Sequence, residues 1–90
     1  MSISIKIVSN NEYEVTDKSK TVTTHLVTLS DEVHEKLTKK KVTKKALLDF
    51  SFKFLLYREP NTSILLFFEL TVISRYFSDY EKGVKKWCSS

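Results

Sequence analysis

The first third of the chain contains two stretches with the pattern of β-strands. In residues 3–8, isoleucine occupies every second position and the residues between are polar, which predicts a half-buried strand. Residues 21–29 are rich in β-branched side chains and predict a second strand. The polar residues 9–20 contain Asn and Asp, which suit turns. We therefore expect an antiparallel β-hairpin over residues 3–29 with a long loop.

A helix start follows the second strand. Ser30 precedes Asp31 and Glu32, and a serine hydroxyl at this position accepts a hydrogen bond from a free N–H of the first turn. The two acidic residues complement the positive end of the helix dipole. These features predict a helix over about 31–40. Because a hairpin alone is marginal in water, its apolar face is expected to rest on this and the following helices.

The longest predicted helix occupies the middle of the chain. It starts at Thr43 and covers 44–59, which contains no Gly or Pro and has apolar residues nearly all round the cylinder. Such a helix is typical of a buried central position. Pro60 is expected to end it, because the residue before a proline avoids the helical region. Asn61 or Thr62 is expected to cap the segment that follows.

The last third predicts further short helices. Ser63–Phe68 is expected to form a short apolar helix, residues 69–71 a joint, and Thr71 the start of a helix through Phe77. Residues 79–87 either extend that helix or form another one, with Gly83 as a weak point. The three- and four-residue spacing of three apolar residues predicts the inward face of this last helix, which comprises Tyr80, Val84 and Trp87.

Length and composition favour one small domain. Ninety residues are typical of a single domain, and a hydrophobic share of 41% supports a core. One Gly and one Pro leave few sharp turns, which favours helices over a many-stranded sandwich. The expected fold class is α+β, with an N-terminal β-hairpin (3–29) packed on three or four α-helices (31–87) in one domain over 1–90.

Cysteine and apolar content bear on the cellular setting. Cys88 is the single cysteine, so no internal disulfide is expected, and a reducing cytoplasmic setting fits best. The first residues lack a basic region followed by a long apolar stretch, so no signal peptide is expected. The most apolar run, Ile64–Phe68, is far shorter than the roughly 20 residues that span a bilayer. No membrane partner is therefore expected.

The positive charge of the chain is concentrated in one segment. Residues 36–45 contain six lysines, and without them the chain has nine basic and eleven acidic residues. A local positive field of this kind attracts anions, including the phosphates of nucleic acid. Lysines at a helix end are also ordinary solubilising residues, and this alternative stays open. The residues proposed to contact an anion or nucleic acid are Lys36, Lys39, Lys40, Lys41, Lys44 and Lys45, which Lys82, Lys85 and Lys86 extend if the last helix packs nearby.

Residues with catalytic chemistry are few. His25 and His34 lack a cysteine or second histidine at metal-ligand spacing. Cys88 lies near the C-terminus, and a single glycine, Gly83, cannot build a phosphate-cradling loop. We therefore expect a protein that is not an enzyme and that uses no metal or other cofactor.

Two resemblances to known proteins are visible. The run Leu-Val-Thr-Leu-Ser-Asp-Glu-Val at 26–33, within residues 24–56, resembles the strand-to-helix junction of ribbon-helix-helix repressors. That resemblance implies a dimer whose strands pair across the two chains and lie in the DNA major groove. It places Thr24, Leu26 and Thr28 on the side facing DNA.

The second resemblance covers residues 46–80. The run at 54–65, together with Arg75, Tyr76, Phe77 and Tyr80 downstream, resembles a group of short uncharacterised bacterial proteins. These proteins combine an N-terminal strand pair with a helical C-terminal half. The resemblance implies a fold and carries no mechanism.

Two functions follow as hypotheses. The first is a small non-catalytic binding protein, a protein-interaction or assembly module that pairs with another protein or with a second copy of itself. It rests on the apolar excess at Ile64–Phe68 and in the aromatic last third, since one small core is not expected to hide all of it. The alternative is a nucleic-acid-binding regulator, a dimer of ribbon-helix-helix type acting through the basic segment Lys36–Lys45.

Overall fold

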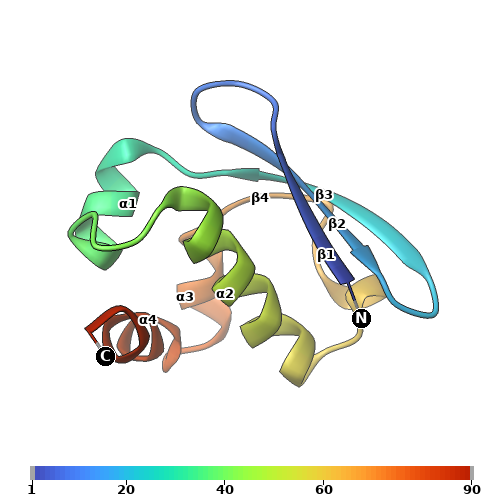
Figure 1. Cartoon of the computed structure of the whole chain (residues 1–90). Coiled ribbons are helices and arrows are strands. Elements are labelled where there is room, and N and C mark those ends of the chain that lie inside the picture. The colour runs from blue at the N-terminus through green and yellow to red at the C-terminus, as the bar shows by residue number, and fades with distance from the viewer. Residues whose placement is uncertain (1, 90) are drawn as a thin grey trace.

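The structure is a computed structural model that describes residues 2–89 (Figure 1). It confirms the α+β class, with a four-stranded sheet and four α-helices. In chain order the elements are β1 (Ser2–Ile7), β2 (Glu12–Lys18), β3 (Val22–Thr28), α1 (Asp31–Thr38), α2 (Lys44–Arg58), the 3-10 helix η1 (Asn61–Ser63), β4 (Phe67–Glu69), α3 (Val72–Tyr76) and α4 (Tyr80–Ser89).

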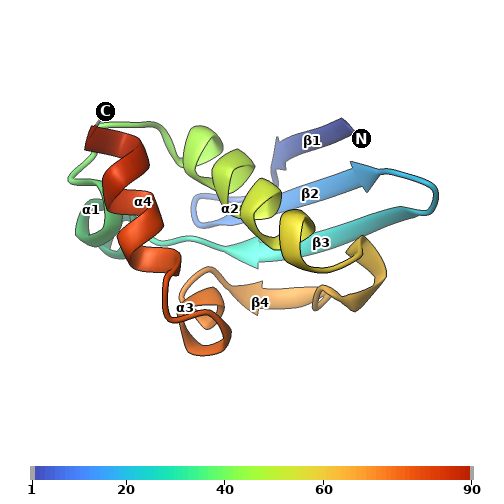
Figure 2. The same cartoon turned by 90° about the horizontal axis from the view of Figure 1, so that it is seen from below.

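The strands lie side by side in sequence order. β1, β2 and β3 form an antiparallel meander, and β4 adds to β3 in the parallel direction. Figure 2 shows β1 and β4 as the two outer strands. The register places Ile5 opposite Val15 and Val15 opposite His25, so these three side chains share the face that α2 covers.

The predicted pairing of residues 3–8 with residues 21–29 is wrong, because β2 lies between them. The polar segment 9–20 was expected to be a loop, but Glu12–Lys18 forms this inner strand. Every second residue of β2 is buried and the residues between are only half-buried, which is the alternation of a strand with one covered face. Its polar composition hid this pattern, because even the buried set includes Asp17, which accepts a hydrogen bond from Ser19 at 2.7 Å.

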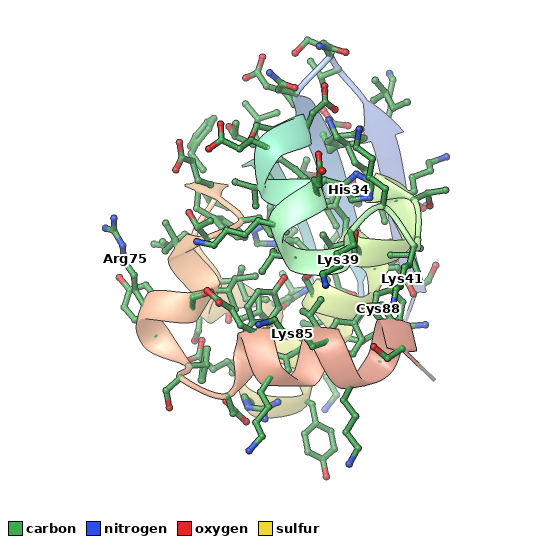
Figure 3. All side chains as sticks on the ribbon, turned by 90° about the vertical axis from the view of Figure 1, so that its left-hand side faces the viewer. His34, Lys39, Lys41, Arg75, Lys85 and Cys88 are labelled. Atoms are coloured by element: carbon green, nitrogen blue, oxygen red, sulfur yellow. The ribbon has the colours of Figure 1, made fainter. Side chains whose placement is uncertain are left out.

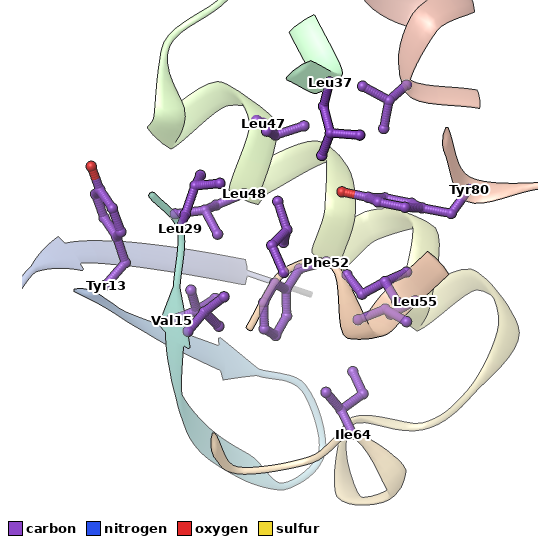
Figure 4. Packing of buried hydrophobic residues seen from close by; sticks show 14 residues of the cluster. Tyr13, Val15, Leu29, Leu37, Leu47, Leu48, Phe52, Leu55, Ile64 and Tyr80 are labelled. Atoms are coloured by element: carbon purple, nitrogen blue, oxygen red, sulfur yellow. The ribbon is translucent and has the colours of Figure 1, made fainter. Parts of the chain in front are cut away.

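Helix α2 crosses one face of the sheet, and its start and end agree with the prediction. The Thr43 hydroxyl accepts a hydrogen bond from the Ala46 N–H, and the helix ends at Arg58, before Pro60. The helix contributes Leu47, Leu48, Ser51, Phe52 and Leu55 to the interior. Figure 4 shows the four apolar residues of this set meeting the buried side chains of the sheet in one cluster. Tyr57, however, is 89% exposed, so α2 is not covered on every side.

The expected helix over Ser63–Phe68 is wrong, because only Ser63 is helical, as the last residue of η1, and β4 begins at Phe67. The exposed edge of β3 explains the difference. The Leu26 N–H donates to the Leu66 carbonyl at 2.7 Å, and His25 Nδ1 lies 2.7 Å from the Leu65 carbonyl. These bonds satisfy polar groups of β3 that would otherwise be buried without a partner.

The turn after α2 is also built differently from the expectation. Pro60 precedes η1, and no side chain caps this short helix. Asn61 is buried, and its Nδ2 donates to the Thr21 carbonyl at 2.6 Å. Asn61 therefore ties the end of α2 to the turn between β2 and β3, and it does not act as a cap.

Helix α4 packs against α2, as its apolar spacing predicts. Tyr80 and Val84 are fully buried, and Trp87 stacks on Phe50 with ring centroids 4.5 Å apart. The helix continues through Gly83 without a break. Among residues 2–89, none of the helices combines the length and apolar character needed to cross a membrane.

A buried hydrogen bond fixes the contact between α2 and α4. The Ser51 hydroxyl donates to the Leu47 carbonyl at 2.7 Å, so the Tyr80 hydroxyl donates to the Ser51 oxygen at 2.6 Å. Burial raises the pKa of the Tyr80 phenol well above its ordinary value. Tyr80 is therefore held as a neutral donor inside the core.

Candidate functional site

The six lysines at 36–45 do not form one surface. Lys44 Nζ pairs with Asp31 Oδ1 at 2.7 Å, and only 12% of the Lys44 side chain is exposed. The hydrogen bond from Lys44 and its positive charge hold the pKa of the Asp31 carboxyl below its ordinary value. Lys44 therefore links the starts of α1 and α2. Lys45 is exposed on α2 and does not line the pocket that Lys36, Lys39 and Lys41 share.

Three of the predicted lysines meet a fourth from α4. Lys36, Lys39 and Lys41 line a pocket of about 290 Å³ together with Lys85. We call this site the basic pocket; its remaining lining residues are Leu37, Thr38, Cys88 and Ser89. Figure 3 shows Lys39 and Lys41 on the turn after α1, with Lys85 and Cys88 on α4 beside them. Lys82 and Lys86 do not line this pocket.

The four lysines of the basic pocket form no salt bridge with any other residue between 2 and 89. None of the residues lining it is acidic. Within residues 2–89, the three salt bridges involve Lys44, Lys53 and Arg58, and none of the four pocket lysines. The four lysines therefore give the lining of the pocket a positive charge, and like charges close together repel one another.

The turn that carries these lysines has an unusual backbone. Lys39 and Lys40 both have a positive φ, 54° and 61°. This left-handed conformation costs a residue with a side chain about 1–2 kcal/mol, and glycine is the usual residue at such a helix end. Lysine therefore occupies two positions where glycine would cost less.

Hydrogen bonds hold the turn in this shape. The Lys39 N–H donates to the Glu35 carbonyl at 2.7 Å, and the Lys41 N–H donates to the Thr38 carbonyl at 3.0 Å. The Thr38 hydroxyl donates to the His34 carbonyl at 2.8 Å. Of the last four carbonyls of α1, those of Glu35 and Thr38 therefore accept backbone hydrogen bonds, which lowers the negative charge that they present at this helix end.

A second candidate site is made of backbone groups. The Val8 N–H donates to the Glu12 carbonyl at 2.9 Å, which fixes the alternation of the β1–β2 ladder. Even-numbered residues of β1 face β2, so the N–H and C=O groups of Ile3, Ile5 and Ile7 face outward. We call this row the β1 edge. No hydrogen bond in the described part of the chain uses these outward groups.

The expectation of exposed apolar surface near Ile64–Phe68 is confirmed for three of the five residues. Leu65, Leu66 and Phe67 are 48%, 56% and 72% exposed, whereas Ile64 is buried. Tyr76, 70% exposed, lies with Leu65 at the mouth of a pocket of about 220 Å³. We call the four exposed residues the apolar patch; the pocket is also lined by Leu55, Glu59, Ser63, Ile64, Phe68, Val72, Ile73 and Phe77.

Both histidines make structural hydrogen bonds. His34 Nε2 lies 2.6 Å from the Val42 carbonyl and so carries the proton, and this bond links α1 to the chain before α2. His25 contacts Thr23 Oγ1 at 2.9 Å as well as the Leu65 carbonyl. Over residues 2–89, no group of three His, Cys, Asp or Glu side chains is arranged to hold a metal ion.

The strand that carries the ribbon-helix-helix resemblance lies inside the sheet. β3 pairs with β2 along one edge, and on the other edge its residues Leu26–Thr28 pair with β4 in the same chain. The strand pairing therefore gives that resemblance no support. Comparison of the chain with protein-family models, with curated proteins and with solved structures gave no match.

Sequence reasoning missed the β1 edge as a site. The repeated isoleucines predicted the strand, but the expected loop at 9–20 left its neighbours undefined. A signal was present, because Tyr13 and Val15 continue the same two-residue alternation among polar residues.

Proposed function

We propose that this chain is a non-catalytic assembly module that pairs with a second copy of itself through the β1 edge. The observation that carries the proposal is the row of unpaired N–H and C=O groups at Ile3, Ile5 and Ile7, on a six-residue strand without proline. Such an edge is a template for another strand.

The side chains of β1 suit pairing with an identical strand. An antiparallel pair centred on Ile5 sets Ile5 against its own copy and Ile3 against the second copy's Ile7. The same register sets Lys6 against the second copy's Ser4, so the two lysines do not face each other. Like charges directly opposite would destabilise the pair. The result is a symmetric dimer with one continuous sheet.

Exposed apolar side chains also support a protein-binding role. Ile7 is 60% exposed and Val8 52% exposed, and both lie at the end of β1. The apolar patch lies beside the opposite edge of the sheet. Exposed contiguous apolar surface commonly marks an interaction site. The interior position of β3 and the separation of the six lysines favour this function over a nucleic-acid-binding regulator.

Replacement of Ile7 by proline tests the proposal. Ile7→Pro removes an outward N–H and leaves the hydrogen bonds between β1 and β2 in place, because proline is tolerated where the N–H faces away from the sheet. Light scattering after size-exclusion chromatography should show a dimer for the native chain and a monomer with unchanged circular dichroism for the variant.

Ile7→Ala is the matched control, because it shortens the same side chain and keeps the N–H. It should remain dimeric. A native chain that is monomeric up to millimolar concentration contradicts the proposal. A folded Ile7→Pro variant that is still a dimer contradicts it as well.

A further inference from the structure

We propose that the basic pocket binds a compact anion that carries at least two phosphate groups. This inference is independent of pairing through the β1 edge, because the pocket lies between the ends of α1 and α4. Four lysines from two segments far apart in the sequence surround one hollow of about 290 Å³. Four positive charges are enough to neutralise a small diphosphate.

The unpaired state of the lysines is the first argument. Lys36, Lys39, Lys41 and Lys85 make no salt bridge within residues 2–89, although Lys44 and Lys53 nearby in the sequence do. No acidic side chain lines the pocket. A bound anion would replace the repulsion among the four ammonium groups with attraction.

The backbone of the turn is the second argument. Lys39 lies in the left-handed region, where glycine fits better. The simplest alternative is that the lysines only offset the negative ends of two helices. That alternative accounts only in part for Lys39, because two carbonyls at the end of α1 already accept backbone hydrogen bonds, Glu35 from Lys39 and Thr38 from Lys41.

The shape of the site favours a small ligand over a nucleic-acid duplex. Ligand pockets usually measure about 300–1,000 Å³, so this pocket is at the small end of the range. The lysines surround a hollow, whereas contacts to a duplex require charges spread along an exposed surface. Lysine is a compact charge with three donors and binds phosphate without fixed geometry.

Inorganic pyrophosphate is the probe, and Cys88 is the reporter. Cys88 lines the pocket and is the only thiol in the chain, so its alkylation by neutral iodoacetamide reports on this site alone. Pyrophosphate should slow the alkylation several-fold and in a saturable way. Sodium chloride at the same ionic strength should not. Amide shifts of Lys39 and Lys41 in NMR titrations give a second measure of the same binding.

Two variants with the same charge change separate the pocket from general electrostatics. Lys41→Gln removes a pocket lysine and should weaken pyrophosphate binding about tenfold or more, as expected for a lost charged hydrogen bond. Lys45→Gln removes an exposed lysine from the same segment and should change binding by less than about twofold. Both positions are exposed, so both variants should keep the native circular dichroism.

Three results would overturn the proposal. The first is protection of Cys88 by chloride as strong as that by pyrophosphate. The second is equal weakening by Lys41→Gln and Lys45→Gln, which would show diffuse attraction. The third is displacement of pyrophosphate by a short DNA duplex at a concentration, counted in phosphate groups, below the one at which pyrophosphate itself binds. This result would identify the site as a nucleic-acid surface.

Discussion

The β1 edge and the basic pocket are both unpaired surfaces, but they are built from different parts of the chain. The β1 edge consists of backbone groups, which every residue except proline supplies. The basic pocket consists of four side-chain charges. Binding at the β1 edge therefore depends on the position of the strand in the sheet. Binding at the basic pocket depends on which side chains line it. Salt should weaken binding at the pocket and affect the edge little.

The two surfaces share one support. α2 packs on β1 and the rest of the sheet with one side, and on α4 with the other. Loss of packing beneath α2 should therefore disrupt both surfaces. Loss of the contact between α2 and α4 should disrupt the basic pocket alone. Changes in the turn after α1 should act mainly on anion binding.

Phe52→Ala should have the largest effect and should disrupt both surfaces. Phe52 is fully buried on α2, with its ring 5.3 Å from His25 and 6.1 Å from Phe68. Loss of this side chain should lower the free energy of unfolding by about 3–5 kcal/mol, as measured by urea denaturation. Tyr57→Ala, an exposed aromatic on the same helix, should change it by less than about 0.5 kcal/mol. Equal effects of the two variants would contradict the assigned core.

Ser51→Ala should affect the pocket and spare the β1 edge. It leaves the Tyr80 hydroxyl buried without its partner, which should lower the free energy of unfolding by about 1–3 kcal/mol. Protection of Cys88 by pyrophosphate should weaken because α4 is held less firmly, whereas dimer formation should not change. The control is the double variant Ser51→Ala, Tyr80→Phe. A double variant no more stable than Ser51→Ala would show that the unpaired hydroxyl is not the cause.

Lys39→Gly should have the smallest effect on stability and the opposite sign. Glycine relieves the left-handed strain, so the free energy of unfolding should rise by up to about 1 kcal/mol while pyrophosphate binding weakens. Lys39→Ala is the matched control, because it loses the same charge and keeps the strain. It should weaken binding equally without a gain in stability. Unchanged binding in both variants would remove Lys39 from the site.

Local signals in the sequence predicted α1, α2 and α4. Ser30 and Thr43 cap α1 and α2 as expected, because a cap involves only the next three residues. Pro60 marks the end of α2 for a similarly local reason. The inward face of α4 followed from spacing alone, and two of its three predicted residues, Tyr80 and Val84, are fully buried.

Pairing between distant segments could not be predicted in the same way. β4 is extended because β3 offers it hydrogen bonds, and residues 63–68 taken alone carry only an apolar signal. The lysine cluster was divided for a related reason. Lys44 forms an ion pair with Asp31, and Lys85 on α4 lines the pocket. Which lysines share the pocket therefore depends on how the helices pack.

The parallel pairing of β3 with β4 also sets an order in time. β2 and β3 join through a short turn, whereas α1 and α2 lie between Leu26 and its partner Phe67 in the chain. Closing a long loop is slower, so β4 should add last during folding and detach first during local opening. A chain caught before this step would present two bare sheet edges, which makes the three-stranded intermediate the species most prone to aggregate.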